Sequence, residues 1–91
     1  MGLKKMGSEK LADRIRDFAL EHYVSPARAS GASEISIRAG DLHNEMGLEH
    51  RHPAVCGALR IERFHQEHHL ELIREEGPRQ GASTTFTFRL H

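Results

Sequence analysis

Three residues that can carry positive charge, His50, Arg51 and His52, lie directly before Pro53. Proline is favourable at the first position of a helix, so the three side chains should surround a helix N-terminus. Free N–H groups and the helix dipole at such an end attract phosphate. Arg51 can bind a phosphate or grip guanine O6 and N7 together, and the imidazoles can donate to the same acceptors. The triplet therefore predicts an anion-binding end, with nucleic acid as the first candidate ligand.

The overall charge does not fit a strongly basic nucleic-acid binder, because 13 basic residues balance 13 acidic ones. Between residues 50 and 63, however, three arginines face a single acid, Glu62. Arg60 and Arg63 lie farther along the helix that Pro53 starts, so they can reach backbone phosphates. Few such contacts predict modest affinity and a shallow dependence on salt. Histidine changes its charge near neutral pH, so binding is expected to tighten as the pH falls from about 8 to about 6.

Metal and enzyme chemistry find less support. His65, His68 and His69 are close together and Cys56 could join them, but no paired-ligand motif of recognised spacing is present. We interpret the histidine segment as a polar connection, with a metal site as the alternative, and expect no cofactor. Cys56 falls in the middle of a helix beside its apolar face, where a buried, unreactive thiol is expected. No Gly-rich phosphate loop or paired-carboxylate motif is present either, so we expect no enzymatic activity.

The length of 91 residues suits a single domain (8–91) behind a short, flexible basic tail (1–7). One cysteine excludes a disulfide within the chain and favours a reducing compartment. No apolar run approaches the roughly 20 residues of a membrane span, and the first residues have no signal-peptide apolar region. The sequence therefore predicts a cytoplasmic protein without a membrane partner.

The spacing of hydrophobic residues predicts the secondary structure of the first half of the chain. Apolar residues recur at helical spacing from Leu11, so a first helix should start at a Ser8 cap. It should end near residues 23–24, because Pro26 disfavours a helical residue before it. Residues 34–38 alternate between apolar and polar, which predicts a short strand.

The second half should hold two helices and a hairpin. A helix is expected from residues 40–41 to Gly47, which suits the left-handed conformation of a helix end. The helix that follows should end near residues 61–63. Alternating apolar residues then predict two strands, at 70–73 and 85–90, joined by a polar tip rich in glycine and proline.

The resulting order is helix, strand, helix, turn, helix, strand, strand. Over about residues 9–90 it resembles the winged helix-turn-helix domains. The most specific part is the segment LHNEMGL with the apolar positions that follow it, namely Leu42, Met46, Gly47, Leu48, Val55 and Leu59. The resemblance implies an α+β fold with three helices, a short strand and a C-terminal β-hairpin wing.

The resemblance also implies DNA binding, as a transcriptional regulator or an accessory DNA-binding module. In this family the second helix of the motif, here residues 53–62, enters the major groove by its N-terminal end. The wing, residues 77–81, would place Arg79 and Gln80 on a minor groove or on backbone phosphates. The candidate nucleic-acid-binding residues are His50, Arg51, His52, Arg60, Arg63, Arg79 and Gln80. Double-stranded DNA is the expected partner.

The alternative is a protein-interaction module, because winged helices also serve in assembly and dimerisation. Zero net charge suits that role, and the apolar residues Leu20, Tyr23 and Val24 could pair the first helix with its copy or with a larger partner. The charge distribution separates the two hypotheses. DNA binding requires the four candidate arginines on one face, whereas acids such as Glu62 and Glu75 on that face favour a protein partner.

Overall fold

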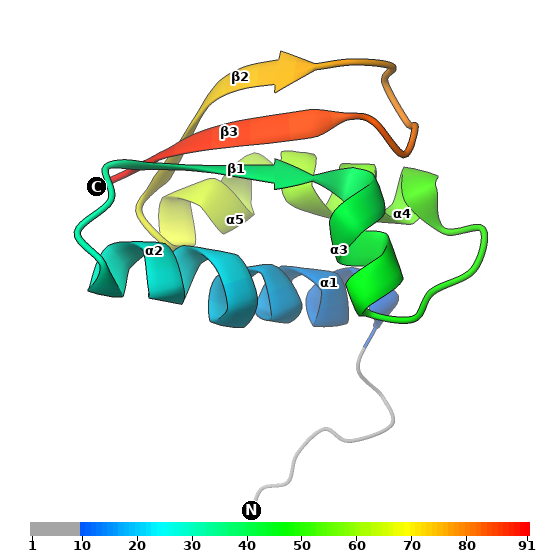
Figure 1. The fold of residues 1–91 in the computed structure, drawn as a ribbon, viewed down its shortest axis with the longest axis horizontal. Helices are drawn as coiled ribbons and strands as arrows, with labels where there is room; N and C mark the ends of the chain where they lie inside the picture. The colour runs from blue at the N-terminus through cyan, green and yellow to red at the C-terminus, as the bar shows by residue number, and fades with distance from the viewer. Residues whose placement is uncertain (1–9) are drawn as a thin grey trace, which may run out of the picture.

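The computed structural model describes residues 10–91, in which helices pack beneath an antiparallel sheet (Figure 1). The predicted tail (1–7) and the Ser8 cap lie outside the described residues. The helical segments are α1 (Leu11–Ala19), η1 (Leu20–Val24), α2 (Ser25–Ala29), α3 (Ala39–Glu45), α4 (His52–Arg60) and α5 (Glu62–Glu67). The strands are β1 (Glu34–Arg38), β2 (Leu70–Glu76) and β3 (Thr85–Leu90). The predicted α+β class is confirmed, and no described helix has the length and apolar character needed to cross a membrane.

The sheet has the order β1-β3-β2, so the last strand lies between the other two. Both pairings are antiparallel, with Phe86 of β3 opposite Ile37 of β1 and Phe88 opposite Leu72 of β2. The predicted strands and hairpin are confirmed. A register shift between Leu72 and Arg74 gives β2 a bulge, which interrupts its regular alternation.

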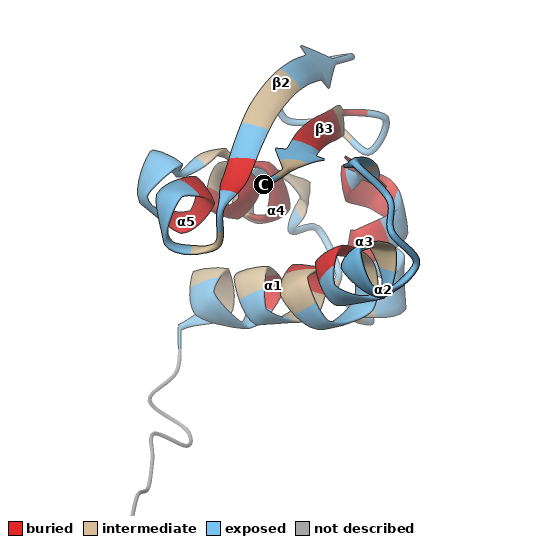
Figure 2. Ribbon diagram, turned by 90° about the vertical axis from the view of Figure 1, so that its left-hand side faces the viewer, coloured by how far each residue is buried: buried red, intermediate tan, exposed pale blue. Residues whose placement is uncertain are grey.

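The core lies between the helices and the sheet face that covers them (Figure 2). Phe86 and Phe88 are fully buried, together with Ile15 of α1, Leu42 of α3 and Leu59 of α4. Burying a side chain of this size contributes about 1.5–3 kcal/mol. The central strand β3 therefore helps to hold α3 and α4, and with them the turn that joins the two helices.

The end of α3 follows the prediction from Gly47. This residue has a left-handed φ of 71°. Its N–H donates to the carbonyl of Asn44, and the N–H of Leu48 donates to the carbonyl of His43. Together these bonds form a Schellman motif, which closes the helix and redirects the chain toward α4.

The prediction that the first helix ends before Pro26 is wrong. Helical backbone continues through Ser25, with φ −62° and ψ −45°, as far as Ala29. The turn directly before the proline, η1, is π-helical. In a regular α-helix the proline ring would clash with a carbonyl of the preceding turn. The wider π turn relieves this clash, so the helix passes through the proline.

The polar connection predicted after α4 is also wrong. Ile61 has extended backbone angles, φ −70° and ψ 121°, and α5 begins directly after it. His65 of α5 is buried and packs edge-on against Phe88. Nε2 of His65 donates to the carbonyl of Leu59 at 2.7 Å, which satisfies an oxygen that the end of α4 leaves without a helical partner. His65 therefore belongs to the core.

Candidate nucleic-acid interface

The turn between α3 and α4 lies at one end of the molecule (Figure 1), and the triplet of residues 50–52 spans the junction of this turn with α4. α4 begins at His52, one residue before Pro53, and ends at Arg60 rather than at residue 62. His50 has a left-handed φ of 55°, so the chain bends sharply there. The side chains of His50 and Arg51 are exposed, and neither makes a hydrogen bond or ion pair within residues 10–91.

A buried histidine of α3 holds this turn in place. His43 is 4% exposed, and its Nε2 accepts a hydrogen bond of 3.1 Å from the backbone N–H of Arg51. Its ring stacks on His52, with centroids 4.0 Å apart and planes at 19°. Because Nε2 must be unprotonated to accept, the proton lies on Nδ1, 3.5 Å from Oδ1 of Asn44. His43 thus fixes the backbone that carries Arg51.

Arg60 was a predicted phosphate contact, but its side chain joins α4 to the hairpin. Its Nε and Nη2 donate to the two carboxylate oxygens of Glu75, at 3.0 and 2.6 Å. Nη2 also donates to the carbonyl of Arg79, and the guanidinium lies 5.4 Å from the centre of the Phe86 ring. The hydrogen bonds from Arg60 lower the pKa of Glu75, and the bond to Glu75 raises the pKa of Arg60. These contacts give Arg60 a structural role.

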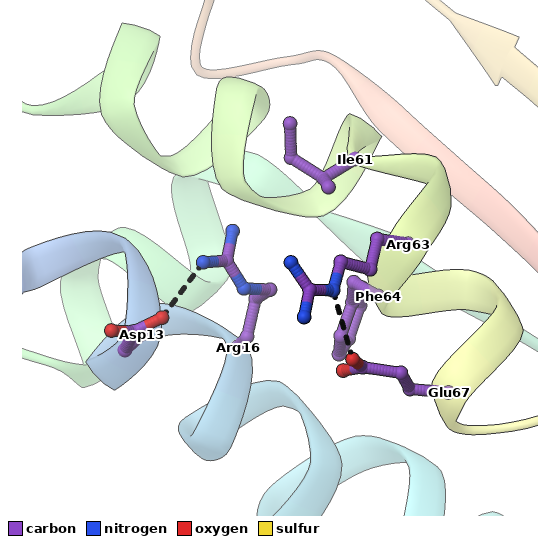
Figure 3. A pocket seen from close by; sticks show the side chains of 6 residues that line it. All are labelled: Asp13, Arg16, Ile61, Arg63, Phe64 and Glu67. Atoms are coloured by element: carbon purple, nitrogen blue, oxygen red, sulfur yellow. Dashed lines mark hydrogen bonds and ion pairs between the residues drawn. The ribbon is translucent and has the colours of Figure 1, made fainter.

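Arg63 lies on α5, and its side chain points toward Arg16 of α1 (Figure 3). Its side chain is 84% exposed, and its Nε donates to Glu67 at 3.1 Å. Across the gap, Arg16 donates to Asp13 at 2.9 Å. The hollow between them has a volume of about 340 Å³ and is lined by Asp13, Arg16, Ile61, Arg63, Phe64 and Glu67. Each arginine has its own acid, so this side of the molecule presents no excess of positive charge.

The hairpin tip, residues 77–84, packs against the start of α3. The N–H of Gly40 donates to the carbonyl of Ala82 at 2.8 Å, and a Cβ at Gly40 would lie 2.6 Å from that oxygen. Only glycine therefore permits this contact. Arg79 and Gln80 are exposed on the tip, at the same end of the molecule as the turn before α4 (Figure 1).

The accessible side of α4 carries no charge before Arg60. It is formed by Pro53, Ala54 and Gly57, which are exposed or half-buried. A Cβ at Gly57 would meet nothing within 4 Å. Such small side chains allow another surface to approach closely, but they cannot form hydrogen bonds with base edges. Any recognition of the DNA base sequence by α4 must therefore come from side chains at its N-terminal end.

The thiol and the histidines give no sign of metal or nucleophilic chemistry in the part of the chain that the structure describes. Cys56 is free and buried, as predicted, and burial raises the pKa of its thiol. A raised pKa keeps the thiol protonated and poorly nucleophilic. Within residues 10–91, no group of three or more histidine, cysteine or acidic side chains is arranged to hold a metal ion.

The structure thus divides the seven candidate residues into two groups. Arg60 and Arg63 are paired with acids, and Arg60 also donates to the carbonyl of Arg79 on the hairpin tip. The remaining five come from the segment at the start of α4 and from the hairpin tip, and we term them the end surface: His50, Arg51, His52, Arg79 and Gln80. Comparison of the chain with models of protein families, with curated proteins and with solved structures gave no match.

Proposed function

We propose that this protein binds double-stranded DNA as a winged helix-turn-helix domain, acting as a transcriptional regulator or an accessory DNA-binding module. The order of elements and the sheet order β1-β3-β2 support the proposal. In this assignment α3 and α4 are the two helices of the motif, and the hairpin of β2 and β3 is the wing. The sharp, glycine-closed end of α3 provides the turn that such a motif requires.

The observation that carries the proposal is the end surface. Arg51 and Arg79 come from the turn and from the hairpin tip, and their side chains make no hydrogen bond or ion pair within residues 10–91. The N-terminus of α4 lies beside Arg51 and favours an anion. This arrangement allows α4 to enter a major groove by its N-terminal end while the tip touches the flanking backbone.

The binding mode should rest mainly on phosphates. With two unpaired arginines and the histidines of the turn, about two to three phosphates are neutralised, so log K should fall with log salt with a slope of about −2 to −3. Arg51 is the side chain best placed to distinguish a guanine, because it can donate twice to one base edge. The uncharged side of α4 adds close approach rather than sequence reading.

Fluorescence anisotropy of a labelled duplex tests the proposal. Wild-type protein is titrated at about 50 mM and about 200 mM salt, a range over which phosphate contacts weaken measurably. Saturable binding at low salt that weakens at higher salt is the expected result. No binding at the lower salt would contradict the proposal.

A second candidate function, a protein-interaction module, is favoured by the hollow between α1 and α5 (Figure 3). Ile61 at this hollow is 47% exposed and is the only large hydrophobic residue so exposed within residues 10–91. A second copy of the chain could cover it. Sedimentation velocity tests this function: a dimer that Ile61→Glu dissociates would support it, and a wild-type monomer at high concentration would exclude self-association.

A further inference from the structure

We infer that His43 is a positioning residue that presents Arg51 to DNA, and that protonation of the His43 ring releases Arg51. The DNA part of this inference rests on the proposed function, whereas its structural part concerns the protein alone. His43 belongs to α3 and lies outside the end surface. It acts on Arg51 through the backbone N–H and leaves the guanidinium free for a ligand.

The contact works in one protonation state only. Nε2 of His43 accepts from the N–H of Arg51 at 3.1 Å. A protonated imidazole carries a donor on both nitrogens, so Nε2–H would then face another donor. The ring is 4% exposed, so little water can separate the two groups. Two donors would then face each other without an acceptor between them, which favours opening of the turn.

The ring of His43 meets groups from the turn and from α4. The backbone N–H of Arg51 approaches from the turn, and the ring of His52 stacks on His43 from α4. His50 lies one residue farther back on the same turn. The N-terminus of α4 adds the positive end of its helix dipole. A proton on Nε2 would therefore point at the N–H of Arg51, beside the positive end of α4.

The nearby acids do not compensate for that charge. On α3, Asp41 pairs with Arg38 at 3.0 Å, and Glu45 accepts a hydrogen bond of 2.9 Å from Tyr23. Glu49 is exposed on the turn. No carboxylate within residues 10–91 forms an ion pair with the His43 ring. In this arrangement no acid therefore takes the place of the N–H of Arg51 as the partner of the ring.

The effect of pH on binding then has two opposing parts. Protonation of His50 and His52 adds positive charge to the end surface and strengthens phosphate contact. Protonation of His43 releases the backbone of Arg51 and weakens that contact. A variant that lacks only the second part, such as His43→Gln, should therefore bind DNA more tightly than wild type at low pH.

NMR of the free protein tests the structural part. Imidazole nitrogen shifts should show the Nδ1–H tautomer of His43 at about pH 8, and amide exchange should show that the N–H of Arg51 is protected. The protection factor of Arg51 should fall about tenfold when the His43 ring takes up its proton. A proton on Nε2 at high pH, or protection that is unchanged through the titration, would overturn the inference.

Two variants of His43 distinguish the role of its hydrogen-bond acceptor from the role of its aromatic ring. His43→Gln keeps an acceptor that cannot titrate, so Arg51 should stay protected at low pH and DNA binding should tighten steadily. His43→Phe keeps the stack on His52 without an acceptor, so protection should be lost at every pH and binding should weaken about tenfold. His22→Gln, at an exposed histidine stacked on Phe18, is the control and should leave both profiles unchanged.

The NMR and DNA-binding experiments test the two parts of the inference independently. If wild-type protein binds no DNA, the tautomer and the Arg51 protection still decide the structural part. If protection behaves as expected but His43→Phe binds DNA as wild type does, His43 shapes the turn without presenting Arg51, and the inference is overturned while the proposed function stands.

Discussion

Arg60 and Glu75 form a two-point ion pair that ties α4 to the β2–β3 hairpin, with bonds of 3.0 and 2.6 Å. Their side chains are only 19% and 27% exposed. A shielded pair of this geometry is stronger than an ordinary surface ion pair. It holds the hairpin against the helix whose N-terminus carries Arg51. A residue whose type suggests DNA contact therefore serves to brace the two parts of the end surface.

Removing this pair should destabilise the fold in a pH-dependent way. The pKa of Glu75 is lowered in the folded protein, so its contribution is fully present above about pH 4.5 and is lost as the pH falls through the lower folded value. Glu75→Gln should cost about 1 kcal/mol at pH 7 and almost nothing in strong acid. Urea unfolding at both pH values measures the difference. Glu76→Gln, at the neighbouring residue, is the control. An equal loss of unfolding free energy in both variants would contradict a stabilising role for the Arg60–Glu75 pair.

Tyr23 of η1 offers an optical report on the contact between the first helical segment and α3. Partial burial, followed by the hydrogen bond to Glu45, raises the pKa of Tyr23 to about 12. The chain has one tyrosine and no tryptophan, so phenolate absorbance reports this residue alone. Glu45→Gln should lower the pKa of Tyr23 measured in this absorbance titration. The pKa should stay above 10.0, because burial contributes more to its rise than the hydrogen bond does. A wild-type midpoint at 10.0 would mean that the phenol is solvated and unpaired.

Gly57 tests whether the uncharged side of α4 approaches DNA. A Cβ there meets open space, so Gly57→Ala should stabilise the helix by about 1 kcal/mol through propensity alone. Gly57→Leu should also fold, but its bulk would stand between α4 and a groove and weaken DNA binding. Urea unfolding and anisotropy measure the two effects. If the leucine variant binds as tightly as the alanine variant, this side of α4 does not face the duplex.

The elements that follow from local chemistry are the ones that the sequence predicts well. The alternation around Phe86 and Phe88 predicts a strand buried on one face, and Gly47 predicts a left-handed helix end. Both depend on neighbours in sequence. The passage of a helix through Pro26 does not, because the π turn that permits it is stabilised by packing of the whole segment.

The site was predictable only in part, since residue type alone does not say which cations are already paired. Arg60 meets Glu75 across 15 positions of sequence, and no local pattern indicates that contact. His43 had a usable signal, because it continues the apolar side of α3 after Ala39 and Leu42. A histidine at such a position has to find a polar partner. Here the partner is the turn that carries Arg51.

The most direct test of the end surface compares Arg51→Ala with Arg63→Ala in DNA binding at low salt. Each variant removes one positive charge from an exposed side chain, and Arg63→Ala also removes the ion pair with Glu67. If the end surface holds the duplex, Arg51→Ala should weaken binding about tenfold or more, while Arg63→Ala, which faces α1, should leave it nearly unchanged. Equal losses, or no loss in Arg51→Ala, would contradict the assignment of DNA contact to this end of the molecule.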